Sequence, residues 1–84
     1  MKDYEVVDLL MDEINVNSNY PEIIKNHGFT PDGISDVFLT QNTPSFVSGT
    51  CTIETTQNMP FYGEFEITIN ENEKNVEFID FDVE

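Results

Sequence analysis

The sequence predicts an α+β fold, in which an N-terminal amphipathic helix and a short second helix pack on an antiparallel meander of three or four strands. Apolar residues recur with the helical period over residues 2–15, whereas residues 45–83 alternate apolar and polar side chains with the period of two that strands produce. Neither kind of element buries its apolar side alone, so we expect the helices to cover one face of the sheet. The 84 residues suit a single domain spanning residues 1–84.

One apolar stripe along residues 2–15 predicts the N-terminal helix. The stripe consists of Tyr4, Val7, Leu10, Met11 and Ile14, and it is widened by Val6 and Leu9. Asp3 and Glu5 fall in the first turn, where carboxylates favour the positive end of the helix dipole. The Asn- and Ser-rich segment that follows is typical of a break between helices.

A short second helix is predicted over residues 21–27. Pro21 is suited to the first helical position, and Gly28 is suited to the left-handed position that closes a helix. Residues 30–33, with the sequence Thr-Pro-Asp-Gly, are typical of a turn. We therefore expect the chain to reverse direction before the sheet begins.

Four segments are candidates for strands, namely residues 34–42, 45–55, 61–70 and 75–83. In the first of them, Val37 and Leu39 alternate with Phe38, which favours a short strand. In the third, the odd positions are apolar or small and the even positions are mostly polar, which is the pattern of a strand with one wet face. Residues 70–74, Asn-Glu-Asn-Glu-Lys, predict a hairpin turn of about three to five residues.

The charge of the chain limits what it binds. Seventeen acidic residues stand against three lysines, no arginine and one histidine, which gives a formal net charge of -14. This charge argues against nucleic acid and anionic membranes as direct ligands. It favours either a purely solubilising role or a partner that is strongly positive.

The apolar residues of the last two strands predict their register. Phe65 and Ile67 should meet Ile79 and Phe81 in the core. Opposed residues of an antiparallel pair point to the same side of the sheet, so the numbers of paired residues must add up to an even value. A β-bulge near Phe78 would change this register.

Either even register gathers acids on the wet face of the hairpin. In one register Asp80 faces Glu66, and two residues further on Asp82 faces Glu64. In the other, Asp80 faces Glu64 and Asp82 faces Tyr62. We expect these four acids to be the central contacts for a basic partner, with Tyr62 as the aromatic anchor. The flanking contacts are expected to be Glu54, Glu71, Glu73 and Glu77.

The sequence does not favour an enzyme or a cofactor. His27 is the only histidine and lies at the end of the short helix, and Cys51 lies in mid-strand on the side expected to be buried, where thiols are inert. No glycine-rich phosphate-binding loop is present. Residues 70–77 lack the pattern of a calcium loop and contain Lys74, so no metal is expected.

Cysteine usage and hydropathy predict a location. A single cysteine rules out an intramolecular disulfide, which favours a reducing, cytoplasmic setting. The first residues place acids within their apolar run, unlike a signal peptide. No apolar stretch approaches the roughly 20 residues of a membrane span, so no membrane contact is expected.

The acidic strand–turn–strand segment EFEITINENEKNVEFIDFDVE, residues 64–84, resembles the small acidic inhibitors carried by phages and other mobile elements. Anti-CRISPR proteins and uracil-DNA glycosylase inhibitors are similar in size, in negative charge, and in pairing a short helical segment with an antiparallel sheet. The resemblance implies a DNA mimic that occupies the nucleic-acid-binding groove of a nuclease, CRISPR effector or DNA-repair enzyme in the cytoplasm of a bacterial host. It assigns no role to individual residues.

Two other functions remain open from the sequence. Immunity proteins of bacterial toxin systems are also small and acidic, and they neutralise basic nucleases. A soluble acidic interaction module without mimicry is the third possibility. The sequence allows a monomer or a homodimer, the latter formed if residues 45–55 are an exposed edge strand that pairs two copies.

Overall fold

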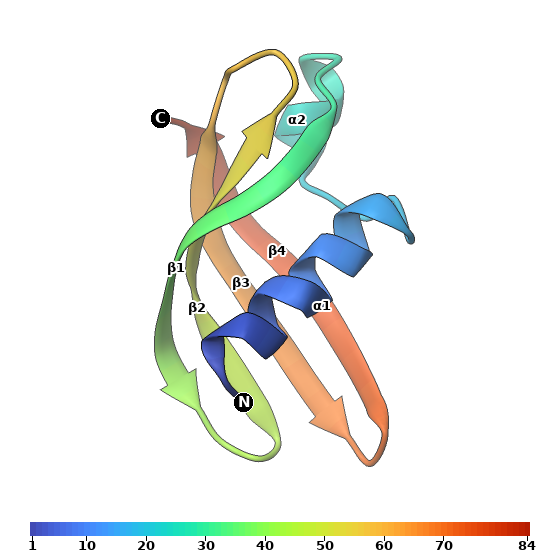
Figure 1. The fold of residues 1–84 in the computed structure, drawn as a ribbon, viewed down its shortest axis with the longest axis vertical. Coiled ribbons are helices and arrows are strands. Elements are labelled where there is room, and N and C mark those ends of the chain that lie inside the picture. Colours follow the sequence, from blue (N-terminus) through green and yellow to red (C-terminus); the bar gives the residue numbers. More distant parts are fainter.

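Four antiparallel strands form one sheet, and their order in space follows their order in the chain. The structure is a computed structural model that describes all 84 residues. Its elements are α1 (Asp3–Asn15), α2 (Glu22–Asn26), β1 (Pro31–Asn42), β2 (Phe46–Thr55), β3 (Phe61–Asn70) and β4 (Glu73–Val83). Figure 1 shows α1 lying across one face of the sheet. The α+β prediction is therefore confirmed, with four strands rather than three.

The helix α1 packs on the sheet through a narrow apolar stripe. Val6, Leu10 and Ile14 are buried at spacings of four residues, and they place the helix over the strands. Tyr4, which the predicted stripe included, is 63% exposed, because it lies off this narrow stripe. The backbone N–H of Lys2 donates a hydrogen bond of 2.9 Å to Glu5 Oε1, which satisfies one of the donors left free at the helix start. Neither helix has the length and apolar run needed to cross a bilayer.

The second helix and the segment after it differ from expectation at one point. Gly28 has φ 72°, so it closes α2 in the left-handed conformation as predicted. Ile24 of this helix is fully buried in the core. The predicted turn at residues 30–33 is wrong, because Pro31 is buried and pairs with Thr55 as the first residue of β1. Pairing of this segment with the end of β2 outweighs the turn tendency of the local sequence.

The strand order also corrects the expected edge. The segment 45–55 becomes β2, which lies between β1 and β3 and hydrogen-bonds to both. The edges of the sheet are β1 and β4. The candidate strand 34–42 is the reason, since it forms the longer strand β1 and pairs with the side of β2 that was expected to be free.

The hairpin between β3 and β4 is tighter than predicted. Asn70 pairs with Glu73, which leaves only Glu71 and Asn72 in the turn instead of three to five residues. Glu71 adopts φ 59°, the left-handed conformation found at the first central position of two-residue hairpin turns. As a result β4 begins two residues before the expected Asn75.

The even register predicted for β3 and β4 is wrong over most of the hairpin. Phe65 pairs with Phe78 and Ile67 pairs with Val76, so the paired numbers add up to an odd value. The paired numbers add up to an even value only at the open end of the hairpin, beyond a register shift between Tyr62 and Glu64. The core takes both Val76 and Phe78 as well as Phe81, and no single register satisfies all three.

A β-bulge reconciles these demands. Asp80 and Phe81 together lie opposite Gly63, and Asp80 has φ 52°. The extra residue turns Phe81 to the side of the core, where it is 8% exposed.

A second bulge lies at the same level of the sheet, on the other edge. In β1, Asp36 and Val37 lie opposite Cys51, and Asp36 has φ 52°. Cys51 in turn pairs with Gly63, the residue opposite the β4 bulge. One row across the sheet therefore begins and ends in a bulge whose first residue is a left-handed aspartate. Two further register shifts occur in β1, on either side of this one.

Candidate partner-binding face

The sheet has one covered face and one open face. The helices pack on the face that carries the buried residues of β2 and β3, such as Val47, Phe61, Phe65 and Ile67. Successive side chains of a strand point to opposite faces, and cross-strand partners share a face. The even-numbered residues of β2 and β3 and their partners in β1 and β4 therefore form the other surface, which we call the open face.

Six carboxylates occupy strand positions on the open face. They are Glu54, Glu64, Glu66, Glu73, Glu77 and Asp82. All six were expected at the site, as was Tyr62, which is 45% exposed on the same face. Two expected residues stand apart from them, because Glu71 lies in the turn and Asp80 lies in the bulge with a left-handed backbone.

The central grouping of acids differs from the prediction. Glu64 lies opposite Ile79, and neither Asp80 nor Asp82 faces it. Glu66 lies opposite Glu77, which makes this the one direct carboxylate pair among the cross-strand partners of β3. Asp82 lies opposite Tyr62, as one of the two expected registers had it.

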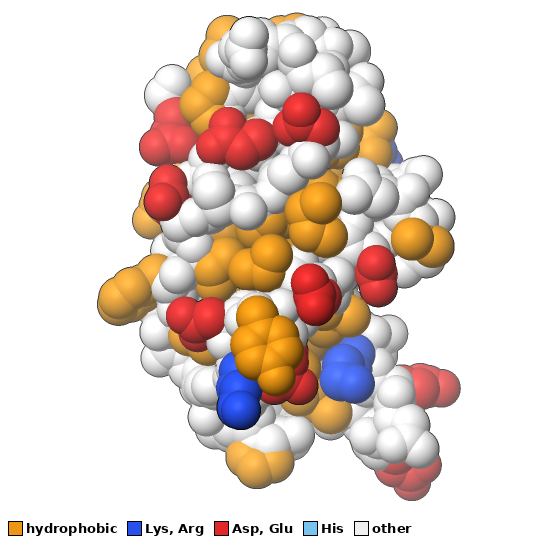
Figure 2. All heavy atoms as spheres, in the orientation of Figure 1, with side chains coloured by type: hydrophobic (Ala, Val, Ile, Leu, Met, Phe, Trp, Pro, Cys, Tyr) orange, Lys and Arg blue, Asp and Glu red, His pale blue; other side chains and the backbone are white.

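All three lysines lie on the helix side of the sheet. Lys2 precedes α1, and Lys25 lies in α2, where it forms the single ion pair of the protein, 3.8 Å from Glu22. Lys74 pairs with Ile69, a residue packed against the core, so it too points to the covered face. Figure 2 views the molecule from the side of α1, and blue lysine side chains are visible among the acids there. The open face carries its carboxylates without a basic residue.

Hydrogen bonds hold only a small part of this acidic surface. Ser35 Oγ donates to Glu54 Oε1 at 2.9 Å, and Thr52 Oγ1 donates to Glu84 Oε2 at 3.3 Å, which brings the last residue of the chain to the same face. Glu64, Glu66 and Glu77 make no side-chain hydrogen bond and no ion pair. Their carboxylates are therefore free to receive donors from a partner.

Apolar side chains also stand on the open face, and sequence reasoning identified only Tyr62 among them. The others are Phe38, Phe46 and Ile79, which pair with Thr50, Thr68 and Glu64. None of the three packs against the core, and Phe38 is 68% exposed. The alternation of Val37 and Leu39 with Phe38 was the signal that could have found it, because it turns Phe38 away from the core.

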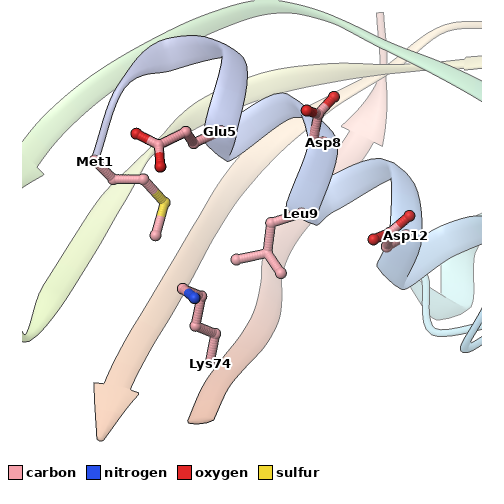
Figure 3. Close-up of a pocket in the computed structure, with 6 residues that line it drawn as sticks. All are labelled: Met1, Glu5, Asp8, Leu9, Asp12 and Lys74. Atoms are coloured by element: carbon pink, nitrogen blue, oxygen red, sulfur yellow. The ribbon is translucent and has the colours of Figure 1, made fainter. Parts of the chain in front are cut away.

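A shallow hollow lies on the helix side, between α1 and the start of β4 (Figure 3). It has a volume of about 280 Å³. Its lining residues are Met1, Glu5, Asp8, Leu9, Asp12 and Lys74. Figure 3 shows the Lys74 side chain directed up toward the hollow, but no carboxylate comes within ion-pairing distance of its ammonium.

The groups most often used in catalysis are separated in this fold. Cys51 is fully buried on the covered face of β2, and this burial raises the pKa of its thiol to about 12. His27 is exposed at the end of α2, with Nδ1 2.7 Å from the carbonyl oxygen of Ile23. No cluster of three or more His, Cys, Asp or Glu side chains is placed to hold a metal ion.

Comparison of the chain with protein-family models, with curated proteins and with solved structures finds no match.

Proposed function

We propose that the protein is a non-enzymatic inhibitor that binds the basic nucleic-acid-binding groove of a target protein through its open face. The observation that supports this function most directly is that the charged residues of the open face are acids alone, whereas the lysines lie among acids on the helix side. Six strand carboxylates share the open face, whereas all three lysines lie on the helix side. A surface of one sign steers and orients a partner of the opposite sign.

The pair formed by Glu66 and Glu77 adds a second line of support. Like charges directly opposite each other on adjacent strands destabilise a sheet, within a range of roughly 0.2–1 kcal/mol per pair. A sheet with a purely structural role gains stability from a lysine or threonine at either position. The acid pair therefore lowers the stability of the sheet, which fits a surface that a basic partner neutralises.

Carboxylates on a strand also suit the geometry of a groove that binds phosphates. Glu64 and Glu66 are two residues apart on β3, a separation of about 6.6–6.8 Å along a strand. Two phosphate steps along one strand of duplex DNA advance by about 6.8 Å. Every β-strand has this spacing, so the charge of the open face rather than its spacing carries the proposal.

The test begins with capture of a target and continues with competition by nucleic acid. Immobilised protein is incubated with bacterial lysate at low salt, and a captured protein is identified by mass spectrometry and purified. DNA oligonucleotides are then titrated against the purified complex. We expect nucleic acid to displace the inhibitor. A complex that persists at saturating nucleic acid would contradict mimicry and favour an immunity protein or another interaction module.

Matched charge variants locate the contact on this complex. The open-face variant E64Q/E66Q/E77Q/D82N and the helix-side variant D3N/D8N/D12N/E22Q remove the same number of charges. We expect only the first to weaken binding and to flatten the dependence of log K on log salt, by about one unit of slope for each phosphate surrogate lost. Equal weakening by both variants would show that net charge alone attracts the target.

A further inference from the structure

The open face presents aromatic rings among its carboxylates. Phe38 is 68% exposed and Tyr62 is 45% exposed, and neither packs against the core. Phe38 belongs to a row that continues through Thr50 and Glu64 to Ile79, so an apolar side chain stands at each end of it. Tyr62 lies on β3, two residues before Glu64 on the same face.

The bulge in β1 puts Phe38 on the open face rather than on the covered one. Beside the bulge in β1, the fold buries part of Val37 against the core and directs the larger Phe38 outward. Without the extra residue at Asp36, the alternation of the strand would direct Phe38 inward and Val37 outward. The backbone thus selects an exposed aromatic ring where a buried one was available.

Exposed rings among carboxylates correspond to the chemistry of single-stranded rather than double-stranded nucleic acid. In a duplex the faces of the bases are stacked inside, and a protein that tracks the backbone meets phosphates and sugars. A single strand exposes base faces between its phosphates, and proteins that bind it combine a basic groove with aromatic side chains on which the bases stack. Carboxylates alone suffice to imitate a duplex backbone, whereas exposed rings among carboxylates suit a single strand.

We propose that the open face mimics single-stranded nucleic acid, with its carboxylates in the place of phosphates and the rings of Phe38 and Tyr62 in the place of unstacked bases. This inference rests on the proposed inhibitory function. The partner that binds the open face is then a protein whose basic groove carries aromatic side chains that stack on these rings. A second copy of the chain is a poor occupant, because it would bring its own net charge of -14 against the same acids.

Two synthetic peptides of equal charge test this inference without knowledge of the target. One alternates lysine with tryptophan and represents a basic groove with stacking platforms, and the other alternates lysine with glycine. We expect the tryptophan peptide to bind about tenfold more tightly by isothermal titration calorimetry. Backbone amide shifts in two-dimensional NMR spectra should map it to β1 and β3 on the open face.

Aromatic variants assign the preference to the two rings. F38S/Y62S should lose the preference and keep the weaker, salt-sensitive binding of both peptides. Both substitutions are at exposed positions, so we expect the variant to fold. Y62F should retain the preference. The control is Y4S, which removes a ring of similar exposure on α1 and should change nothing.

The outcomes separate the inference from the function on which it rests. Equal affinity for the two peptides, with salt-sensitive binding at the open face, would overturn the single-strand mimic and leave the acidic inhibitor in place. A preference for tryptophan that survives F38S/Y62S would also overturn it. Failure of the folded protein to bind either peptide at low salt would count against the inference and the proposed function together.

Discussion

The ring of Phe81 lies over Gly63, at the point where the β4 bulge meets β3. A Cβ atom on residue 63 would stand 2.5 Å from Cγ and 2.7 Å from Cα of Phe81, closer than real Cβ contacts allow. The glycine is therefore required by packing rather than by backbone conformation, since its φ is not in the left-handed region. Gly63 leaves the space that the bulge fills with an aromatic ring.

The first prediction concerns this contact. G63A should lower the free energy of unfolding by about 1–3 kcal/mol, because the added methyl group forces Phe81 and its backbone to move. Urea denaturation followed by circular dichroism measures the change. G33A is the matched control, because a Cβ there meets Glu54 at an ordinary 3.8 Å, and its effect should stay within about 0.5 kcal/mol. Similar losses in both variants would show that the ring does not constrain residue 63.

The second prediction concerns the left-handed turn residue. E71G should raise the free energy of unfolding by about 0.5–1 kcal/mol, because glycine adopts φ near 59° without the steric cost that a side chain carries. E73G removes the same charge two residues later, within β4, and should lower stability instead, since glycine weakens a strand. The same urea experiment compares the two. A shift of the same sign in both would mean that lost charge, not turn geometry, determines the result.

The third prediction concerns the carboxylate pair of the open face. E77K places a lysine opposite Glu66 and should raise the free energy of unfolding by about 0.2–1 kcal/mol at low ionic strength. The gain should shrink in 1 M salt, where charges are screened within about 3 Å. In the E66Q background, E77K should raise the free energy of unfolding by less, because the lysine no longer faces a carboxylate. A double-mutant cycle measures this difference. We expect E77K also to weaken target binding, so that stability and function change in opposite directions.

The fourth prediction concerns alkaline pH. Burial raises the pKa of the Cys51 thiol from 9.0 to about 12, so between these values the folded protein holds a proton that the unfolded chain has lost. Stability contributed by this group is complete below pH 9 and declines by up to about 1.4 kcal/mol per pH unit as the pH rises toward 12. C51A removes that decline, so the difference between the two proteins should narrow by about 2 kcal/mol from pH 8 to pH 10.5. If the two proteins differed in free energy of unfolding by the same amount at every pH, the raised pKa of Cys51 would be contradicted.

Thiol accessibility gives the same residue an independent check. An aromatic disulfide reagent at pH 8 should label Cys51 only after denaturant is added, because the side chain is fully buried. Fast labelling of the native protein would show that the strand opens at this point.

Much of the fold follows from periodicity in the sequence. The buried positions of α1 and the alternation along residues 61–70 were sufficient to predict a helix on an antiparallel sheet, and β3 has the predicted bounds. Register was harder, because apolar residues at positions 76, 78 and 81 require opposite alternations within one strand. Such a conflict of alternation is itself the sequence signal of a bulge, and it occurs again around Asp36.

The candidate site was predicted in its composition but not in its arrangement. The acids of β3 alternate with its apolar residues, so Glu64, Glu66 and Tyr62 could be assigned to one face from alternation alone. The pairing of Glu66 with Glu77 follows from the two-residue turn, which was expected to be longer, and the bulge at Asp80 ends this register. Phe38 was missed as a contact although its alternation with Val37 and Leu39 turns it away from the core, because the acids of the other strands drew the prediction to β3 and β4.

The row of bulges also governs how the protein behaves in a crowded solution. An edge strand with a long regular ladder recruits other strands, and an exposed aromatic face beside it would favour amyloid-like association. Here β1 is interrupted at three points and β4 is interrupted at Asp80, so neither edge is regular along its whole length. The aspartates at φ 52° therefore protect the edges of a molecule that displays Phe38 to solvent, and they disfavour its association through those edges.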